Sequence, residues 1–376
     1  MFSDPHEQQL REIKSLAVGF DDSTRELLGR VRDARTELAP PAEPLIAFVH
    51  VPKTVGAIAT NMLATAYSRA ALRDAGNYLK SPERTETKLR RRAGHWEEWL
   101  RSGGRAAVGH VPYGLLRQYL PATTRYMTFL REPVDRVVSH YYGHIQRTGT
   151  ERDKKRLERG SIMADSLEEA LVELRSPELS NLATRFLGGN PSPLGKLQAT
   201  ALDDAKANLR EFAFVGIHER LDESIVLLQR SLQLDLTPYV SRHATVDRPT
   251  VEELPTAERA LIAEHNRLDM ELYEFAGTLF ENAAASAEEG LEAEVDRLQA
   301  LSRDATDRAF EVARAWLDRE LPPGTARPKA ELLAAADGAR VSRAALKDLA
   351  NTSVDRELSD GQVTWARRSD DHELGG

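Results

Sequence analysis

The stretch 45–69 constrains the fold of this chain more than any other. An apolar run at 45–51, bounded upstream by prolines, is typical of a buried strand in a parallel sheet. A short turn, Pro-Lys-Thr-Val-Gly at 52–56, follows it, and a helix-forming run at 57–69 comes directly afterwards. A turn of this kind points backbone N–H groups and the positive end of the helix dipole at an anion. The sequence therefore predicts an α/β fold with an anion site at this turn.

Lys53 lies in that turn, where its ammonium group would meet a bound phosphate or sulfate. A lysine at such a place is more often a solvated surface charge, and the pattern alone leaves both interpretations open. The string G-x-x-x-x-G-K-[ST] of a Walker A loop does not occur anywhere in the chain. A GTPase or ATPase of that type is therefore disfavoured.

Length and composition set the outer limits. The 376 residues are enough for one large α/β domain with smaller additions. The net charge of −8 argues against a general affinity for nucleic acids, and the absence of Cys excludes disulfides, thiolate nucleophiles and Cys-ligated metals. No apolar run approaches the length of a membrane span, and the N-terminus lacks the apolar core of a signal peptide. We therefore expect a cytoplasmic protein without membrane contact.

A second apolar run, 105–111, predicts another buried strand that ends near His110. In open α/β sheets the loops at the carboxyl ends of the strands form the site, so His110 is expected beside Lys53. Imidazole is the side chain most easily poised as a base near neutral pH. A capping or packing histidine is the alternative interpretation, and the pattern alone favours it.

A third strand at 125–130 leads through Arg131 into a predicted helix at 134–147. Ser139 lies about two turns into this helix, off its apolar stripe. Arg131 and Ser139 could converge on one phosphate, which the arginine would hold with a forked pair of hydrogen bonds. The alternative is a salt bridge from Arg131 to Asp135 and an ordinary helix serine.

His140 and His144 stand four residues apart on the same predicted helix. This spacing suits a metal ion, but the sequence offers neither a glutamate in the zincin pattern nor an evident third ligand. We therefore expect both histidines to be structural or surface residues, and we expect no metal site.

The ordered set of motifs resembles a family of sulfotransferases that use 3′-phosphoadenosine-5′-phosphosulfate (PAPS). The similarity is strongest to the carbohydrate branch, which includes heparan sulfate 2-O-sulfotransferases and many bacterial relatives. It covers about residues 45–280, and it rests on the strings FVHVPKTVG, VGHVPYG, YMTFLREPVDRVVSHYY, NLATRFLGG, FAFVGIHERLDESIVLL and HNRLDMELYEFA. The resemblance implies a P-loop NTPase-like fold of three layers around a central parallel sheet, with PAPS as the sulfuryl donor and no metal.

The resemblance also implies roles for the residues of the first turn. Lys53, Thr54 and Gly56 match the loop that holds the 5′-phosphosulfate. Lys53 would neutralise the charge on the oxygen that bridges sulfur and phosphorus as that bond breaks. His110 matches the histidine proposed to take the proton from the acceptor hydroxyl.

Further positions match the part of the family pattern that binds the rest of the nucleotide. Arg131 and Ser139 match the pair that binds the 3′-phosphate. In the family a basic loop near 241–249 closes over the nucleotide, which makes Arg242 and Arg248 candidates, although a plain surface loop fits that stretch equally well.

One departure from the family pattern bears on activity. The family loop commonly reads P-K-T-x-G-T-S, whereas this chain has Ala57 and Ile58 in place of the two hydroxyl residues. Each lost hydrogen bond to a charged oxygen weakens binding by roughly 1.5–3 kcal/mol. Thr60, nearly a turn further on, is a substitute donor. Weak PAPS binding, use of Thr60 and loss of activity all remain open.

The predicted organisation has four parts. Residues 1–40 form a helical arm, 41–282 the sulfotransferase-like domain, 283–323 a long helix and linker, and 324–370 a small winged-helix-like module with a hairpin around Asp360-Gly361. The terminal helices are candidates for homo-oligomer contacts. A DNA contact through the last module is disfavoured but open, because its second predicted helix, 342–349, has only two basic residues, Arg343 and Lys347.

Two functions are carried forward from the sequence. The first is a PAPS-dependent sulfotransferase that acts on a hydroxyl of a carbohydrate or a glycosylated small molecule. The second is a catalytically decayed sulfotransferase fold that serves as a binding or regulatory protein, whose C-terminal wing engages a protein or DNA partner. The surviving charged residues favour the first, and the missing loop hydroxyls favour the second.

Overall fold

The computed structural model describes residues 44–67, 70–147, 157–158, 162–192, 194–240, 248–320, 326–328 and 362–364. The predictions for the arm 1–40, for Arg242 and for the helices of the winged-helix-like module lie outside these residues. Within that module the structure describes two short strands that pair in an antiparallel manner, β6 (Ala326–Pro328) and β7 (Gln362–Thr364).

The centre of the fold is a sheet of five parallel strands in the order β2-β3-β1-β4-β5. All four residues of β1 are buried, since this strand lies between β3 and β4. The strands are β1 (Ile46–Val49), β2 (Leu72–Asn77), β3 (Ala106–His110), β4 (Arg125–Leu130) and β5 (Phe214–Ile217). This confirms the predicted α/β fold with a central parallel sheet.

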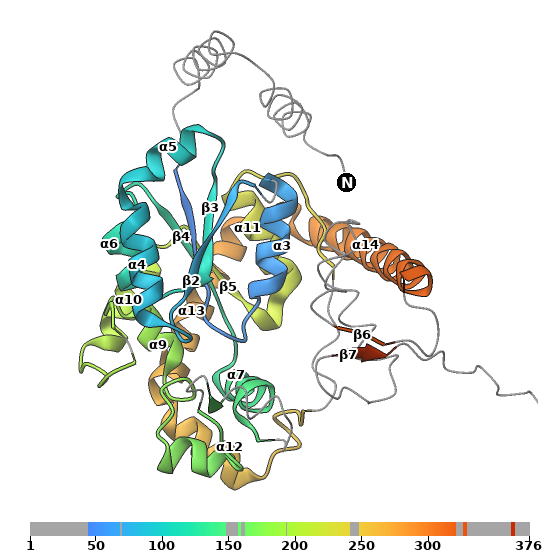
Figure 1. Ribbon diagram of the computed structural model, residues 1–376. Helices are drawn as coiled ribbons and strands as arrows, with labels where there is room; N and C mark the ends of the chain where they lie inside the picture. Colours follow the sequence, from blue (N-terminus) through green and yellow to red (C-terminus); the bar gives the residue numbers. More distant parts are fainter. Residues whose placement is uncertain are drawn as a thin grey trace, which may run out of the picture.

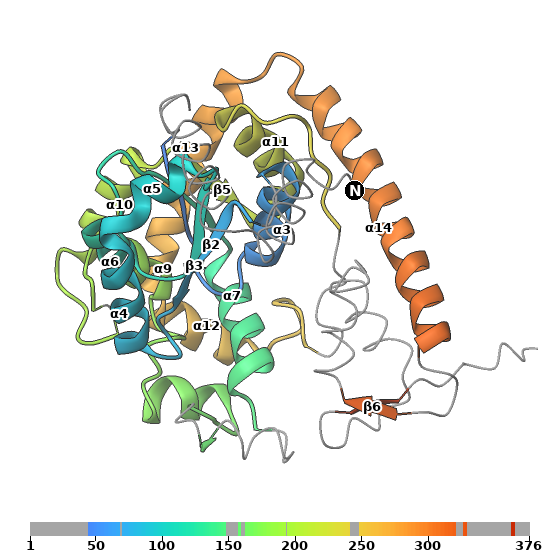
Figure 2. The same cartoon turned by 45° about the horizontal axis from the view of Figure 1, so that its top comes forward.

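Helices cover both faces of the sheet, which makes three layers (Figure 1). The helices are α3 (Gly56–Tyr67), α4 (Pro82–Arg92), α5 (Trp96–Arg101), α6 (Tyr113–Tyr119), α7 (Pro133–His140), α9 (Leu182–Leu187), α10 (Ala201–Glu211), α11 (Leu221–Ser231), α12 (Thr256–His265), α13 (Arg267–Ser286) and α14 (Leu291–Glu320). In Figures 1 and 2, α4, α5 and α6 lie on one side of the sheet, and α3 and α11 lie on the other. The arrangement agrees with the P-loop-like fold that the resemblance implied.

Helix α7 crosses the carboxyl edge of the sheet and carries much of the site. Pro133 occupies its first turn, and the Glu132 side chain accepts hydrogen bonds from the backbone N–H groups of Val134 and Asp135 at 3.0 and 2.7 Å. The helix predicted at 134–147 is present as far as Ile145, but it is not α-helical throughout. The chain instead widens into a π turn at Tyr141–Ile145, whose Gln146 N–H donates to Tyr141 O at 2.9 Å.

A second interruption separates α12 from α13. Asn266 ends α12 and precedes α13, because its buried side-chain amide donates to Leu179 O at 2.7 Å as well as to Ile262 O. The bond to Leu179 ties this break to the segment before α9. A side chain that bonds to backbone outside its own helix favours an interruption there.

Helix α14 starts against the core and then extends away from the sheet (Figure 2). Its first half packs on α11, where Leu291 and Leu298 are buried in the same core as the sheet. Arg230 of α11 fixes the start of α14 with hydrogen bonds to Glu294 Oε2 at 2.9 Å and to Ala287 O at 2.6 Å. In the described parts of the chain, no helix is long and apolar enough to cross a lipid bilayer.

Candidate active site at the carboxyl edge of the sheet

Three predicted site residues meet at the carboxyl edge of the central strands. Lys53 follows β1, His110 ends β3 and Arg131 follows β4. The Arg131 Nη1 group donates to the backbone oxygen of Lys53 at 3.1 Å, and His110 Nδ1 lies 3.0 Å from the backbone oxygen of His50. Segments far apart in the sequence are therefore joined by hydrogen bonds at a single sheet edge, as the order of strands and turns predicted.

Lys53 has an unusual backbone conformation and a lowered pKa. Its backbone lies in the left-handed region, with φ at 69°. Its side chain is partly buried, and burial together with the positive charges of Arg131 and Arg248 lowers its pKa to about 8. A β-carbon on Gly143 would lie 3.0 Å from Lys53 Nζ, so the ammonium group rests against the π turn after α7. Among the described residues no acidic side chain pairs with this ammonium, which lies near two arginines, and this arrangement favours an anionic ligand.

The other residues predicted to hold the phosphosulfate lie in the turn and in the first turns of α3. Thr54 donates its hydroxyl to Val51 O at 2.9 Å, which closes the turn. Gly56 is the first residue of α3, and its backbone therefore belongs to the helix terminus that favours anions. Thr60 lies one turn further along α3 and is partly buried.

The hydrogen bond of His110 determines which ring nitrogen is available for chemistry. A backbone carbonyl accepts only, so Nδ1 carries the proton and Nε2 carries the lone pair. Burial lowers the pKa of His110, which the charges of His140 and Lys80 lower further, while the His50 carbonyl and Glu178 oppose the shift. His110 is therefore neutral at pH 7 and has a basic nitrogen, as a general base requires.

Arg131 and Arg248 share one carboxylate, that of Asp135. Arg131 binds Asp135 Oδ2 through both Nε and Nη2, with the Nε contact at 2.7 Å, and Arg248 Nη1 donates to Asp135 Oδ1 at 2.5 Å. Burial raises the pKa of Asp135, but the hydrogen bond from Arg248 and the charge of Arg131 outweigh it and lower that pKa. The salt bridge that stood as the alternative for Arg131 is thus present, and it also brings Arg248 to the site. Ser139 is buried on α7, one turn beyond Asp135.

Sequence reasoning missed the contact between His50 and His110 and the partner of His140. His50 stacks on His110, with ring centroids 4.0 Å apart and an interplanar angle of 32°. At the end of α7, His140 Nε2 lies 2.7 Å from Glu178 Oε2, and the His140 ring stacks on His144 with ring centroids 5.2 Å apart. The contacts of His140 agree with the structural role expected for it. In the described residues no group of three His, Cys, Asp or Glu side chains is arranged to hold a metal ion.

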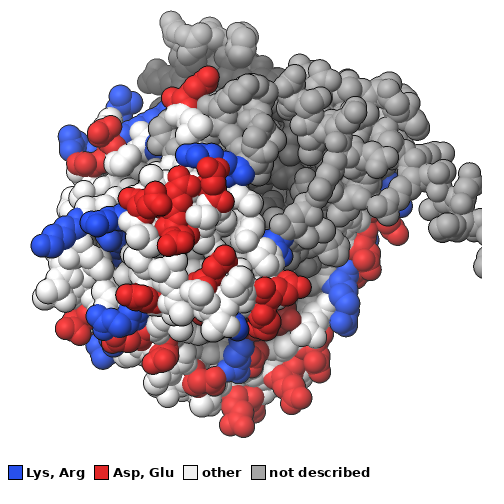
Figure 3. Space-filling model, turned by 90° about the horizontal axis from the view of Figure 1, so that it is seen from below, with Lys and Arg blue, Asp and Glu red and all other residues white. Residues whose placement is uncertain are grey.

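The positive charge of the site is local. Figure 3 views the end of the molecule that carries α7 and α12, and acidic and basic side chains are mixed over this face.

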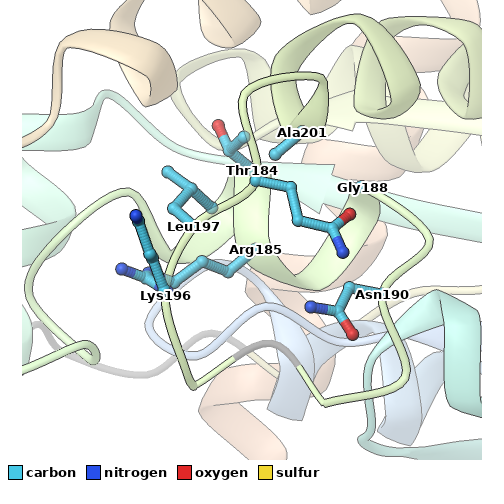
Figure 4. Close-up of a pocket in the computed structure, with 8 residues that line it drawn as sticks. Thr184, Arg185, Gly188, Asn190, Lys196, Leu197 and Ala201 are labelled. Atoms are coloured by element: carbon cyan, nitrogen blue, oxygen red, sulfur yellow. The ribbon is translucent and has the colours of Figure 1, made fainter.

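A separate small cavity lies between α9, the loop that follows it and the start of α10 (Figure 4). Its volume of about 10 Å³ suits a single water molecule, and none of the predicted site residues line it.

Comparison with known proteins identifies the family. The family model of galactose-3-O-sulfotransferases matches residues 109–319, which is more than half of the chain. The chain belongs to this carbohydrate sulfotransferase family. The match includes His110, Arg131, Ser139 and Arg248, whereas Lys53 lies before its first residue. The sequence resemblance to carbohydrate sulfotransferases is confirmed.

Individual relatives agree with this assignment. Heparan sulfate 2-O-sulfotransferase 1 is 27% identical over 197 residues in mouse and in human, covering 48% of this chain and 54% of the relative. Heparan-sulfate 6-O-sulfotransferase 2 of Danio rerio is 31% identical over 180 residues, covering 41% of this chain and 38% of the relative. The chain thus spans about half the length of the 2-O-sulfotransferases it matches, and less of the 6-O-sulfotransferase.

Proposed function

We propose that this protein is a PAPS-dependent sulfotransferase that moves a sulfuryl group to a hydroxyl of a carbohydrate or a glycosylated small molecule. The observation that carries the proposal is the meeting of Lys53, His110 and Arg131 at one sheet edge, with the basic nitrogen of His110 not engaged by the carbonyl that orients its ring. Family membership supports the same class of reaction.

The residues at this edge fit the donor nucleotide. PAPS carries a 3′-phosphate and a 5′-phosphosulfate, and two clusters of positive groups are available for them. Arg131 and Arg248, with Ser139 beside them on α7, would hold the 3′-phosphate through charged, forked hydrogen bonds. Lys53 and the backbone N–H at Gly56 would hold the phosphosulfate at the start of α3.

The protein groups supply what sulfuryl transfer to an alcohol needs. PAPS supplies the sulfuryl group, and the new bond joins sulfur to the acceptor oxygen while the sulfur–oxygen bond to the 5′-phosphate breaks. His110 Nε2 takes the proton of the acceptor hydroxyl, which is a poor nucleophile without a base. The Lys53 ammonium stabilises the negative charge that collects on the departing phosphate oxygen. Fixed donors and Lys53 take the place of a metal ion in this scheme.

Calorimetry with adenosine 3′,5′-bisphosphate, the product nucleotide, tests the proposal first. We expect binding in the micromolar range, its loss in Arg131→Ala, and no change in Arg101→Ala, which removes an exposed arginine of α5. Absence of nucleotide binding by the intact protein at high micromolar concentrations would rule out the proposal that it is a PAPS-dependent sulfotransferase.

A transfer assay tests the chemical step separately. The acceptors are galactose-terminated oligosaccharides and desulfated heparan oligosaccharides, which the family and the relatives suggest. His110→Ala should bind the nucleotide as the parent does and lose transfer. Sulfuryl transfer by His110→Ala at the parent rate would show that His110 is not the general base.

The second candidate is a nucleotide-binding or regulatory protein without transfer activity, a decayed sulfotransferase whose C-terminal module engages a protein or DNA partner. The absence of hydroxyls at Ala57 and Ile58 favours it. Binding of the bisphosphate without transfer to any acceptor of the panel would support this alternative.

A further inference from the structure

His50 lies where the anion-binding turn and the general base meet. It directly follows β1, and its ring stacks on His110 on one side, at 4.0 Å, and on Phe48 at 5.1 Å, with an interplanar angle of 17° to Phe48. Its backbone N–H donates to Gly109 O at 3.3 Å, and its backbone oxygen accepts from His110. The position of the His50 ring is therefore fixed by its neighbours on the sheet.

The nitrogen-bearing edge of this ring faces the first residue of α3. A β-carbon placed on Gly56 would lie 1.6 Å from His50 Cε1, 1.8 Å from Nε2 and 2.3 Å from Nδ1. The imidazole thus occupies the space beside the Gly56 backbone that any larger residue would fill. In the described part of the chain neither ring nitrogen of His50 has a hydrogen-bond partner, although the side chain is partly buried.

The charge state of His50 makes one of these nitrogens a donor. Burial, and to a lesser degree the charge of His110, lower the pKa of His50 well below its usual value. At neutral pH the ring is therefore uncharged and has one N–H group and one lone pair. A partly buried polar group without a hydrogen-bond partner destabilises the folded protein, because it has lost its bonds to water. A bound ligand that accepts its hydrogen bond removes this free-energy cost.

We propose that His50 is a nucleotide-binding residue whose ring N–H donates to the phosphate or sulfonate oxygens held at the start of α3. In this role it replaces the hydroxyl donors that the loop lacks at Ala57 and Ile58. The inference rests on the proposed function, because the ligand is the same nucleotide. It adds a donor from the end of β1, where neither the family pattern quoted above nor the sequence reasoning placed one.

The variant His50→Phe distinguishes the contribution of the ring N–H donor from that of ring packing. Phenylalanine keeps an aromatic ring against His110 and Phe48 and removes both nitrogens. We expect its affinity for adenosine 3′,5′-bisphosphate, measured by calorimetry, to fall by about tenfold to a hundredfold, the loss typical of one hydrogen bond to a charged oxygen. His95→Phe, which changes an exposed histidine, should bind as the parent does. The double variant His50→Phe/Ala57→Thr should regain most of the lost affinity, since it restores a donor on the loop.

Nitrogen-15 NMR of the histidine rings in the intact protein gives a second readout that needs no folded variant. Addition of the bisphosphate should shift a His50 ring N–H resonance downfield. Affinity of His50→Phe within twofold of the parent, or an unmoved His50 resonance at saturation, would overturn the inference while leaving the proposed function intact. Absence of nucleotide binding by the parent protein would overturn both.

Discussion

Lys53 should take up a proton when the nucleotide binds. Burial and the charges of Arg131 and Arg248 hold its pKa at about 8, so about half of the Lys53 side chains are neutral at pH 8. A bound phosphate favours the ammonium form and raises this pKa. A return to the ordinary lysine value of about 10.4 would make binding at pH 8 consume about half a proton, and binding at pH 6.5 almost none.

Calorimetry of adenosine 3′,5′-bisphosphate in buffers with different ionisation enthalpies measures this uptake. Lys53→Arg is the matched variant, since arginine keeps the positive charge and stays protonated at both pH values. The nucleotide's own titration is common to both proteins and cancels in the comparison. An uptake at pH 8 that is equal in the parent and in Lys53→Arg would show that Lys53 is already fully charged, and it would refute the electrostatic account of this turn.

Two further predictions concern stability, and urea unfolding measures both. Gly56→Ala should cost about 1–3 kcal/mol, because its β-carbon would overlap the His50 ring, whereas Gly277→Ala, which meets no neighbouring atom in α13, should stabilise the protein by up to about 1 kcal/mol. Equal effects of the two changes on the free energy of unfolding would mean that the His50 ring moves aside without a measurable cost. Asp269→Ala should cost about 3 kcal/mol, since this buried carboxylate accepts three hydrogen bonds at the start of α9. Asp204→Ala, at an exposed bond to Thr200, should cost under about 1 kcal/mol, and a similar loss in both would contradict the role given to burial.

The strands that sequence reasoning located and the strand that it missed differ in burial. The runs at 45–51, 105–111 and 125–130 contain β1, β3 and β4, because strands covered on both faces need continuous apolar sequences. β2, with the sequence Leu-Arg-Asp-Ala-Gly-Asn, pairs only with β3 at the edge of the sheet, and Ala75 is its single buried residue. An edge strand held mainly by main-chain hydrogen bonds leaves little trace in the hydrophobic pattern.

The same distinction applies to the site. Lys53 and Arg131 could be predicted because each follows an apolar run, and His110 because it stands near the end of one, and parallel strands bring such positions to one edge. His50 stands near the end of its run as His110 does, but it was not singled out, because its proposed role depends on the rings and the glycine that tertiary structure places around it. Arg248 was one of two candidates, with Arg242, since its place beside Arg131 depends on a shared carboxylate far away in the sequence.

The shared carboxylate accounts for the unusual state of Lys53. Lys53 lies near the charges of Arg131 and Arg248, and the Asp135 carboxylate accepts three hydrogen bonds, all of them from these two arginines. Burial lowers the pKa of Lys53 most, and the repulsion of the two guanidinium groups lowers it further, since no acidic side chain among the described residues pairs with this lysine. Asp135 keeps the two arginines together before any ligand arrives. The positive charge that it does not balance stays at the turn after β1, beside the His50 ring and the start of α3, where a second anionic group would be held.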